Sequence, residues 1–375
     1  MTLEVPVPSY LDAISPYRSG LGNIAIARET KKRLGRLIKL SSNENPLGLS
    51  PKTREVLASL HLSSDEDPSR YPDPDGMDLR TLLANRLGVP MDWVTLGSGS
   101  VELIHIAIQA FLPQGAATVQ SQYAYDTWEK ESKLRGGVVK TVPAAKDYGH
   151  DLDGMLAAID DKVTAVFVCN PNNPTGSFIG RAALERFLEK VPARVLVVLD
   201  EAYFDFVPAE DAYDSMELVR RYPNLLVTRT FSKLYGMAGL RLGYGVAQPE
   251  ITELLNRLRP TFNVGVYPML AGLTALNDEE HSRKTLEINR KGMAQVAKGL
   301  DALGVEQLPS KANFIMMRVG DWKTVHRRLL DHGVQVRPIA NYGFPEWLRV
   351  SIGLPEENEA FLTALKDALG KNEKD

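Results

Sequence analysis

Cysteine, long apolar runs and an excess of charge are scarce or missing in this sequence, and each shortage excludes a class of protein. Only one of the 375 residues is cysteine, Cys169, so no disulfide can form within the chain. We therefore expect a reducing compartment, the cytoplasm. Lys and Arg total 44 against 47 for Asp and Glu, which gives a formal charge of −3. Since there is no basic tail or acidic block, we expect neither a nucleic-acid nor a membrane partner.

Several other signals are also missing. No apolar run approaches transmembrane length, and the first ten residues lack the apolar core of a signal peptide. The six histidines are scattered without the spacing of metal ligands, so no metal site is predicted. There is no internal repeat and no low-complexity segment. With 44% apolar residues the chain can bury a large core, and its length allows two domains.

Strand-like apolar runs alternate with helical patterns between residues 94 and 247. This alternation predicts an α/β fold, with a mainly parallel sheet covered by helices on both faces. From Pro268 onward the pattern changes to long amphipathic helices, three strand-like runs and a final helix at 357–369. We therefore predict an N-terminal arm (1–40), a large domain (41–260) and a smaller α+β domain (261–375).

Candidate functional side chains stand at the ends of the predicted strands. In open α/β sheets, ligands bind beyond the carboxyl ends of the strands. Gly97, Tyr123, Asn173, Asp200 and Lys233 all occupy such positions. The sequence therefore predicts a binding site along this edge of the sheet.

Lys233 differs from an ordinary surface lysine because hydroxyl and guanidinium donors lie close to it in the sequence. Thr230, Ser232 and Arg241 can hold a phosphate while the lysine amine forms a Schiff base with an aldehyde. Pyridoxal phosphate carries both groups, and its ring nitrogen needs an acidic partner. Asp200, at the end of an apolar run, is the candidate for that partner.

A glycine-containing turn at residues 97–100 joins a predicted strand to a helix at 101–111. The backbone amides and the positive helix end of such a turn suit a phosphate. A dinucleotide fingerprint would need a third glycine where Glu102 stands, and the acidic ribose partner is missing. The alternative is that the glycines serve only the tightness of the turn.

Seven segments together resemble one family, and the resemblance covers nearly the whole chain in order. The family is the histidinol-phosphate aminotransferases, a branch of the fold-type-I pyridoxal-phosphate enzymes. The segments are 42–48 (SNENPLG), 71–73 (YPD), 97–100 (GSGS), 170–176 (NPNNPTG), 200–203 (DEAY), 230–233 (TFSK) and 348–353 (LRVSIG).

The resemblance implies a chemical role for four of the matching residues. Lys233 would form the Schiff base with pyridoxal phosphate and carry a proton between substrate and cofactor. Asp200 would keep the pyridine nitrogen protonated, while Tyr203 and Asn173 would hydrogen-bond the phenolate oxygen of the ring. For Asn173 the alternative is turn formation, because Asn-Pro is common in turns.

Further residues would hold the phosphate and the ring of the cofactor. By the same resemblance, Tyr123 would stack on the ring face. The phosphate would be held by Thr230, Ser232, Arg241 and the backbone amides of Ser100 and Val101.

Four residues are implied in substrate binding and assembly. Arg349 and Arg337 would take the anionic group of the substrate, and Tyr17 is a candidate for closing over it. Tyr71 would reach across a homodimer interface toward the neighbour's cofactor, so that the active sites are shared. The alternative for Tyr71 is that it covers a helix end.

The expected activity is transfer of an amino group from histidinol phosphate to 2-oxoglutarate, by a ping-pong route in histidine biosynthesis. Two departures from the family pattern put the preferred donor in question. Val101 replaces the usual acidic residue, and the loop from Tyr123 to Asp126 lacks its usual preceding proline. An aromatic amino-acid aminotransferase is therefore the alternative, and a pyridoxal-phosphate lyase or decarboxylase is a third. A transcription regulator of this fold needs a DNA-binding region, for which the residues before Ser41 leave no room.

Overall fold

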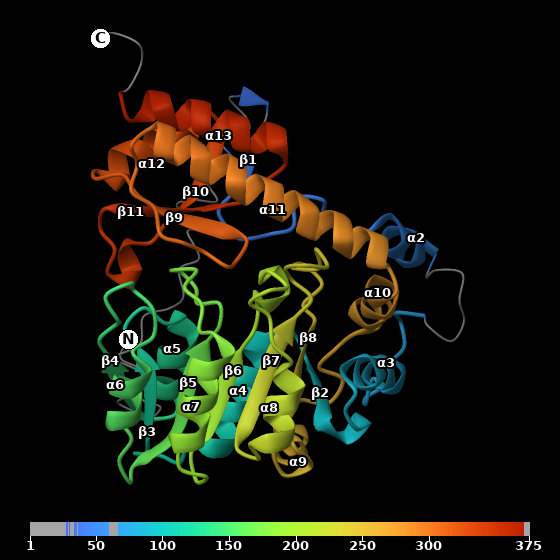
Figure 1. Cartoon of the computed structure of the whole chain (residues 1–375). Coiled ribbons are helices and arrows are strands. Elements are labelled where there is room, and N and C mark those ends of the chain that lie inside the picture. The colour runs from blue at the N-terminus through green and yellow to red at the C-terminus, as the bar shows by residue number, and fades with distance from the viewer. Residues whose placement is uncertain (1–27, 29, 31–33, 36, 60–66, 371–375) are drawn as a thin grey trace, which may run out of the picture.

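The computed structural model describes residues 28, 30, 34, 35, 37–59 and 67–370, which form a larger and a smaller layered unit (Figure 1). The larger unit contains a seven-stranded sheet in the order β2-β8-β7-β6-β5-β3-β4. Within it, β8 is antiparallel to both neighbours and the other pairs are parallel. The remaining six strands therefore end at one edge. The strands are β2 (Val94–Gly97), β3 (Ala117–Ser121), β4 (Val138–Val142), β5 (Val163–Cys169), β6 (Leu196–Asp200), β7 (Leu225–Thr230) and β8 (Gly243–Val246).

Helices cover both faces of this sheet because its strands alternate between two apolar cores. In β5, Val166 and Val168 belong to one core, whereas Ala165 and Phe167 belong to the other. The first core includes residues of α6 (Leu152–Ala157), α7 (Arg181–Lys190) and α8 (Ser215–Arg221). The second includes residues of α4 (Ser100–Phe111), α5 (Asp126–Leu134) and α9 (Pro249–Leu258). The predicted α/β class with a mainly parallel sheet is confirmed.

Three further helices pack together beside β2. They are α2 (Pro51–Ser59), α3 (Met77–Leu87) and α10 (Val266–Leu276), with α10 in contact with both of the others. Short 3₁₀ turns occur at η3 (Met91–Trp93), η4 (Phe204–Phe206) and, in the smaller unit, η5 (Ala340–Tyr342).

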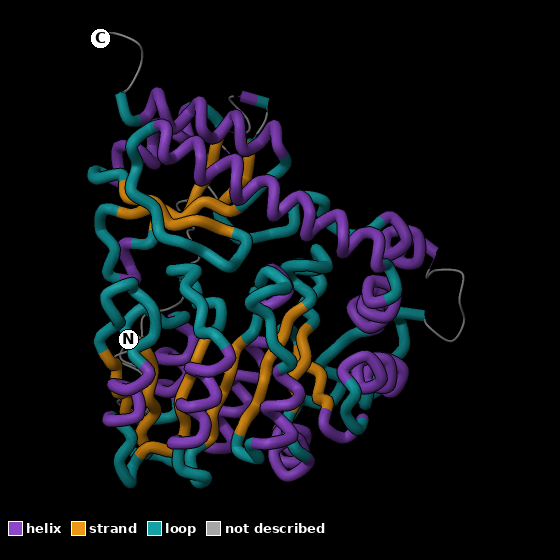
Figure 2. The backbone as a smooth tube through the Cα atoms, in the orientation of Figure 1, coloured by secondary structure: helices purple, strands orange, loops and turns teal. Residues whose placement is uncertain are grey.

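The smaller unit is a four-stranded sheet in the order β1-β10-β11-β9, with helices on one face (Figures 1 and 2). Its strands are β1 (Ile38–Leu40), β9 (Phe314–Arg318), β10 (Val334–Pro338) and β11 (Trp347–Ser351), and its helices are α11 (Glu279–Ala302), α12 (Trp322–Asp331) and α13 (Pro355–Ala368). Leu348 and Val350 of β11 face the helices. By the period of two, Arg349 and Ser351 lie on the opposite face, toward the larger unit.

The two cores divide the chain differently from the predicted domains. β1 precedes residue 41, yet it pairs in parallel with β10, and Leu40 enters the smaller core. α10 follows residue 260, yet Ala271 and Ala275 pack into the core of the larger unit. The larger unit therefore extends to the end of α10, and the boundary predicted at 260 is too early.

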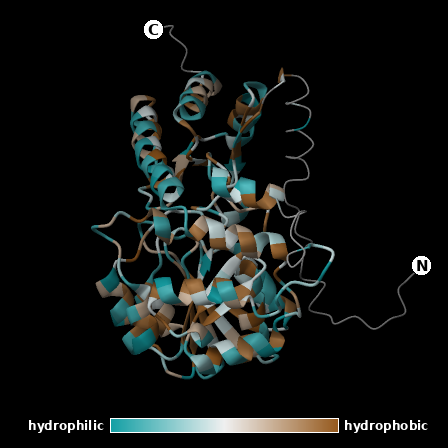
Figure 3. Ribbon diagram, turned by 90° about the vertical axis from the view of Figure 1, so that its right-hand side faces the viewer, coloured by the Kyte–Doolittle hydropathy of each residue, from teal (hydrophilic) through white to brown (hydrophobic). Residues whose placement is uncertain are grey.

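The helices carry mixed surfaces. In Figure 3, hydrophilic and hydrophobic residues alternate along the ribbon, as expected for helices with one face on a core. Even α11, which has 24 residues, carries charged side chains along much of its length. Within the described residues, no helix has both the length and the apolar character that crossing a bilayer requires.

Candidate active site

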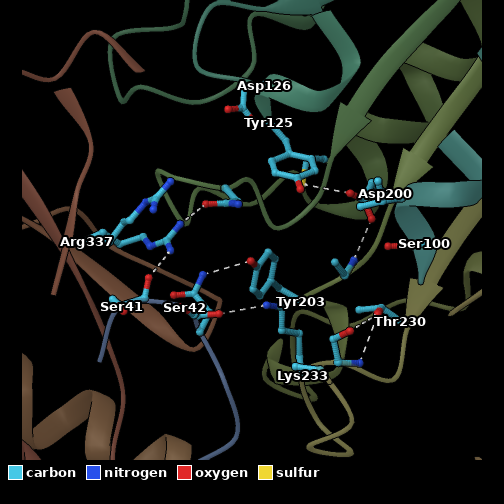
Figure 4. A pocket seen from close by; sticks show the side chains of 18 of the residues that line it. Ser41, Ser42, Ser100, Tyr125, Asp126, Asp200, Tyr203, Thr230, Lys233 and Arg337 are labelled. Atoms are coloured by element: carbon cyan, nitrogen blue, oxygen red, sulfur yellow. Dashed lines mark hydrogen bonds between the residues drawn. The ribbon is translucent and has the colours of Figure 1, made fainter. Parts of the chain in front are cut away.

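A cavity lies between the two units, at the edge where the parallel strands of the larger sheet end (Figure 4). The larger unit supplies the ends of β5, β6 and β7 and the start of α4. The smaller unit supplies Arg337, Tyr342 and Arg349. Eleven of the predicted site residues line it: Ser100, Val101, Asn173, Asp200, Tyr203, Thr230, Ser232, Lys233, Arg241, Arg337 and Arg349.

Lys233 lies in the turn after β7, in surroundings that weaken its positive charge. Its Nζ donates to the carbonyl oxygen of Ser42 at 3.2 Å and lies 5.4 Å from the centre of the Tyr203 ring. Burial, together with the guanidinium of Arg349, lowers the pKa of this amine to about 8. A part of the amine is therefore neutral near pH 7, as a nucleophile or a base must be.

Asp200 ends β6 and is only 4% exposed. Its Oδ1 accepts hydrogen bonds from the Thr228 hydroxyl and the Ala202 amide, each at 3.2 Å. In the described part of the chain, its Oδ2 receives only a long contact from the Cys169 thiol, at 4.0 Å. Burial raises the pKa of this carboxyl to about 6. Oδ2 is therefore placed to accept a strong hydrogen bond from a cationic N–H group.

The start of α4 is shaped to receive a phosphate. Ser100 and Val101 form its first turn, where backbone N–H groups have no partner within the helix. A Cβ at Gly99 would clash with the guanidinium of Arg241, and a Cβ at Gly243 would clash with the backbone nitrogen of Ser100. Glycine at these two positions allows Arg241 and the helix start to approach each other.

Two hydroxyls complete this part of the cavity, and a carboxylate outside its lining supports the turn. The Thr230 hydroxyl donates to Ser232 Oγ at 3.0 Å, so both lie together beside the helix start. Glu102 accepts a hydrogen bond from the Ser98 amide at 2.6 Å, and this bond fixes the conformation of the turn. Glu102 thus stabilises the turn from the position where a dinucleotide-binding turn would have glycine.

Tyr203 is held by a network that reaches into the smaller sheet. Asn43 Nδ2 donates to the Tyr203 hydroxyl oxygen at 3.0 Å, and the Ser351 hydroxyl donates to Asn43 Oδ1 at 2.8 Å. Burial raises the pKa of the Tyr203 phenol, so its hydroxyl stays protonated and can donate into the cavity.

Arg337 and Arg349 lie directly opposite each other on the antiparallel strands β10 and β11, and both line the cavity. Like charges in this arrangement repel each other. Arg349 is 6% exposed and donates to Asn173 Oδ1 and to the Ser41 carbonyl oxygen. Its Nε is buried without a hydrogen-bond partner, and among the described residues no carboxylate forms a salt bridge with it. The pair therefore offers a site for an anion.

Of the two tyrosines that follow β3, Tyr125 lines the cavity and Tyr123 does not. Tyr123 packs against Phe344, with ring centres 4.2 Å apart, and against Tyr148 at 6.0 Å. Tyr123 is therefore not among the residues that line the cavity, and its stacking on the cofactor stays a prediction. The chain turns between the end of β3 and the start of α5 at Asp126, and this turn directs the second tyrosine inward.

The last two predicted site residues are Tyr71 and Tyr17. Tyr71 is 81% exposed, outside the cavity, and stacks on Phe262 with ring centres 4.4 Å apart. Tyr17 lies outside the described residues.

Sequence reasoning assigned no role to several residues that the structure brings to the cavity. Asn43 and Ser42 belong to a segment that the resemblance had marked, so the motif was a usable signal. Tyr342 had no such signal, because η5 is a short irregular turn between β10 and β11. For Asp126, the only signal in the sequence was its position at the end of a loop that departs from the family pattern.

The residues present fit the predicted cofactor. An aldehyde would react with the amine of Lys233, a phosphate would bind at the start of α4 with Arg241, and a basic ring nitrogen would hydrogen-bond Asp200 Oδ2. These three groups occur together in pyridoxal phosphate.

Comparison with known proteins supports the same assignment. The model of the family "Aminotransferase class I and II" matches residues 36–365. Histidinol-phosphate aminotransferase 1 of Cupriavidus pinatubonensis is 48% identical over 369 residues, 96% of each chain. Histidinol-phosphate aminotransferase 2 of Ralstonia nicotianae is 46% identical over 370 residues, 98% of each chain. A solved structure, histidinol-phosphate aminotransferase from Sinorhizobium meliloti in complex with pyridoxal-5'-phosphate, has a TM-score of 0.86 at 26% identity, covering 97% of this chain and 98% of that one. The resemblance predicted from the sequence is confirmed, and the chain belongs to the class I and II aminotransferase family.

Proposed function

We propose that this protein is a pyridoxal-phosphate-dependent aminotransferase that moves the amino group of histidinol phosphate to 2-oxoglutarate, a step of histidine biosynthesis. The observation that carries the proposal is the single cavity shared by Lys233, Asp200 and the pair Arg337 and Arg349. The lysine and the carboxylate suit the cofactor, and the arginine pair suits a donor that carries a phosphate. Curated relatives that match nearly the whole chain bear the name histidinol-phosphate aminotransferase.

The cofactor is held at both of its polar ends. When bound, pyridoxal phosphate supplies an aldehyde that captures amines and a ring that accepts electrons. Asp200 Oδ2 would accept the hydrogen bond of the ring nitrogen, and Tyr125, which lines the cavity, would contact the ring. The phosphate would be bound by Thr230, Ser232, Arg241 and the backbone amides of Ser100 and Val101.

Lys233 is the proton carrier of the reaction. With its pKa lowered to about 8, Nζ would take the proton from the α-carbon of the bound substrate and pass it to the cofactor. The Tyr203 hydroxyl and Asn173 lie beside Lys233 in the cavity and donate to developing negative charge there.

Arg349 and Arg337 bind the anion of each substrate in turn. The phosphate of histidinol phosphate occupies the pair in the first half of the reaction, and a carboxylate of 2-oxoglutarate occupies it in the second. Since both substrates need the same two side chains, they bind one after the other, which is the ping-pong order.

The enzyme is a cytoplasmic homodimer in this proposal, with Tyr71 reaching toward the partner's cofactor. Three large side chains are exposed on or beside the neighbouring helices α3 and α10, namely Tyr71, Met77 and Tyr267. A cluster of this kind is typical of an interface. The single cysteine, Cys169, is buried and free, as expected in a reducing compartment.

An aromatic amino-acid aminotransferase is the second candidate, favoured by Val101, which places an apolar side chain in the cavity wall. The test is a comparison of kcat/KM for histidinol phosphate, phenylalanine and tyrosine, with purified enzyme and 2-oxoglutarate. We expect histidinol phosphate to be favoured by about tenfold or more. Lys233→Ala serves as the inactive control for contaminating transaminases.

Two results would overturn the proposal. A ratio of kcat/KM values below one would assign the aromatic alternative. Release of CO₂ without transfer to 2-oxoglutarate would assign a decarboxylase.

A further inference from the structure

A carboxylate, that of Asp126, lines the cavity that also contains the two substrate-binding arginines. Asp126 begins α5, directly after the loop that departs from the family pattern, and its side chain is half-buried. Figure 4 shows Asp126 and Arg337 on the far side of the cavity from Thr230, where the cofactor phosphate would lie. Asp126 therefore belongs to the part of the cavity that is left for the substrate.

The surroundings of Asp126 do not fully compensate its charge. Arg337 and Lys130 lie near enough to stabilise the carboxylate, and the Tyr342 hydroxyl donates a hydrogen bond to it. Burial nevertheless outweighs these three groups and leaves the pKa of Asp126 above its ordinary value. A further donor inside the cavity would stabilise the ionised form.

Neither of two simpler explanations accounts for this carboxylate. A first-turn acid favours the positive end of its helix, but that contact requires no opening into a cavity. For binding anions, a carboxylate beside Arg337 is unfavourable, because it repels the phosphate or carboxylate that the arginine attracts. Its presence indicates that one substrate has, besides its anion, a group that donates hydrogen bonds.

The proposed amino donor has such a group. Histidinol phosphate carries a phosphate at one end and an imidazole ring at the other, and the ring has an N–H in each of its protonation states. Phenylalanine and tyrosine have no N–H on their rings. The arginine pair thus suits the phosphate of this molecule, and Asp126 suits the N–H of its ring.

Building on the proposed function, we infer that Asp126 accepts a hydrogen bond from the imidazole N–H of the amino donor and thereby determines selectivity for imidazole over phenyl donors. A buried acceptor left without its donor disfavours the phenyl analogue, which is how a polar pocket rejects a ligand of similar shape.

The test compares histidinol phosphate with phenylalaninol phosphate, which keeps the phosphate and replaces imidazole by phenyl. The measured quantity is the ratio of the two kcat/KM values, which isolates the ring from the anion. We expect Asp126→Leu to lower this ratio about 10- to 100-fold, and Asp126→Asn to lower it less, since an amide oxygen still accepts a hydrogen bond. Asp153→Asn, an exposed acid in the first turn of α6, is the matched control and should leave the ratio unchanged.

A second variant distinguishes a role of Asp126 in donor selectivity from a role in linking the larger and the smaller unit. Tyr342→Phe removes the hydrogen bond that joins η5 to Asp126 but keeps the carboxylate. The inference requires this variant to retain the wild-type ratio. If the Asp126 variants slow both donors equally, Asp126 only joins the two units and the inference is wrong.

Failure of the proposed function gives a different result. In that case the wild-type enzyme itself does not process histidinol phosphate, whatever the Asp126 variants do. As a control, the cofactor absorbance and the circular dichroism spectrum of each variant should match those of the wild type, which shows that the fold is retained.

Discussion

At the residue scale, the buried carboxylate of Asp200 lowers the stability of the cofactor-free protein and favours binding of the cofactor. Burial raises its pKa from the ordinary 3.8 to about 6, so the native state binds more protons than the unfolded chain between about pH 4 and 6. The free energy of unfolding contributed by this group therefore falls as the pH rises through that range. At neutral pH the buried charge is stabilised only weakly by the amine of Lys233, and the ring nitrogen of the cofactor would supply a further cation.

This balance predicts opposite effects of Asp200→Asn on stability and on binding. The amide keeps an oxygen for Thr228 and Ala202 but carries no charge. At pH 7 the cofactor-free variant should be more stable than wild type by roughly 1–3 kcal/mol, and the difference should shrink toward pH 4. Urea unfolding at several pH values measures the first effect, and titration with pyridoxal phosphate measures the expected loss of affinity. Unchanged cofactor affinity in the variant would contradict the role given to Asp200.

We predict that Arg349 contributes more to substrate binding than Arg337 does. Arg349 is almost fully buried and has an unpaired Nε, whereas Arg337 is half-buried and lies near Asp126. Arg349→Lys should therefore raise KM for both histidinol phosphate and 2-oxoglutarate, with a loss of about 10- to 100-fold in kcat/KM, since lysine lacks the planar fork. Arg337→Lys is the matched variant, and we expect a smaller loss. Steady-state kinetics of both variants with both substrates tests this prediction. A larger loss of kcat/KM in Arg337→Lys than in Arg349→Lys would make Arg337 the main anion site.

At the scale of elements, a buried ion pair ties together the ends of β6 and β7. Glu201 follows β6, its side chain is fully buried, and its carboxylate lies 2.8 Å from the guanidinium of Arg229 in β7. The Ser215 hydroxyl donates to the other oxygen of Glu201 at 2.6 Å. These neighbours hold the two strand ends that carry Asp200 and Thr230.

Removing one partner of this pair should be strongly destabilising. Arg229→Met leaves Glu201 buried and charged without its counter-ion, and we expect a loss of about 3–5 kcal/mol in the free energy of unfolding. Arg181→Met breaks the surface ion pairs of Arg181 with Glu185 and Glu217 and should lose less than about 1 kcal/mol. Adding Glu201→Gln to Arg229→Met should recover part of the stability. Urea denaturation of all four proteins tests this, and equal losses in the two single variants would refute it.

The elements that could be predicted from sequence are those with local signals. The helix predicted at 101–111 matches α4 (Ser100–Phe111) to within one residue, because the glycine turn before it marks its start. β4 has exposed and half-buried residues in place of an apolar run, and it was not predicted. The alternation of apolar and polar residues placed Asp200 and Lys233 at strand ends, which is why the chemistry at the centre of the site could be deduced.

The parts that could not be predicted depend on contacts distant in sequence. The opposition of Arg337 and Arg349 follows from the register of β10 and β11, which no local pattern specifies. Asn43 and Ser351 meet across 308 positions of sequence. Tyr123 was preferred over Tyr125 because both rings follow β3, and only the turn before α5 decides which one faces the cavity.

At the scale of the whole molecule, the cavity is assembled from two units, and the proposed dimer would add a third contributor. Tyr71 is too exposed to be a core residue, and its ring is fixed by stacking on Phe262. A rigid, exposed aromatic ring of this kind is suited to an interface. If it enters the partner's site, each site needs Lys233 of one subunit and Tyr71 of the other.

This arrangement predicts that two defective subunits restore each other. Lys233→Ala lacks the reacting amine, and Tyr71→Ala lacks the proposed contact to the partner's cofactor, so each homodimer should have little or no activity. In a mixed dimer, the site with an intact Lys233 receives Tyr71 from the Lys233→Ala partner and is complete. Random mixing of equal amounts makes half of the dimers hybrid with one complete site each, so activity should return to about a quarter of wild type. Co-refolding the variants at equal concentration and measuring kcat per subunit tests this. Activity no greater than the mean of the two parents would place Tyr71 outside the partner's site.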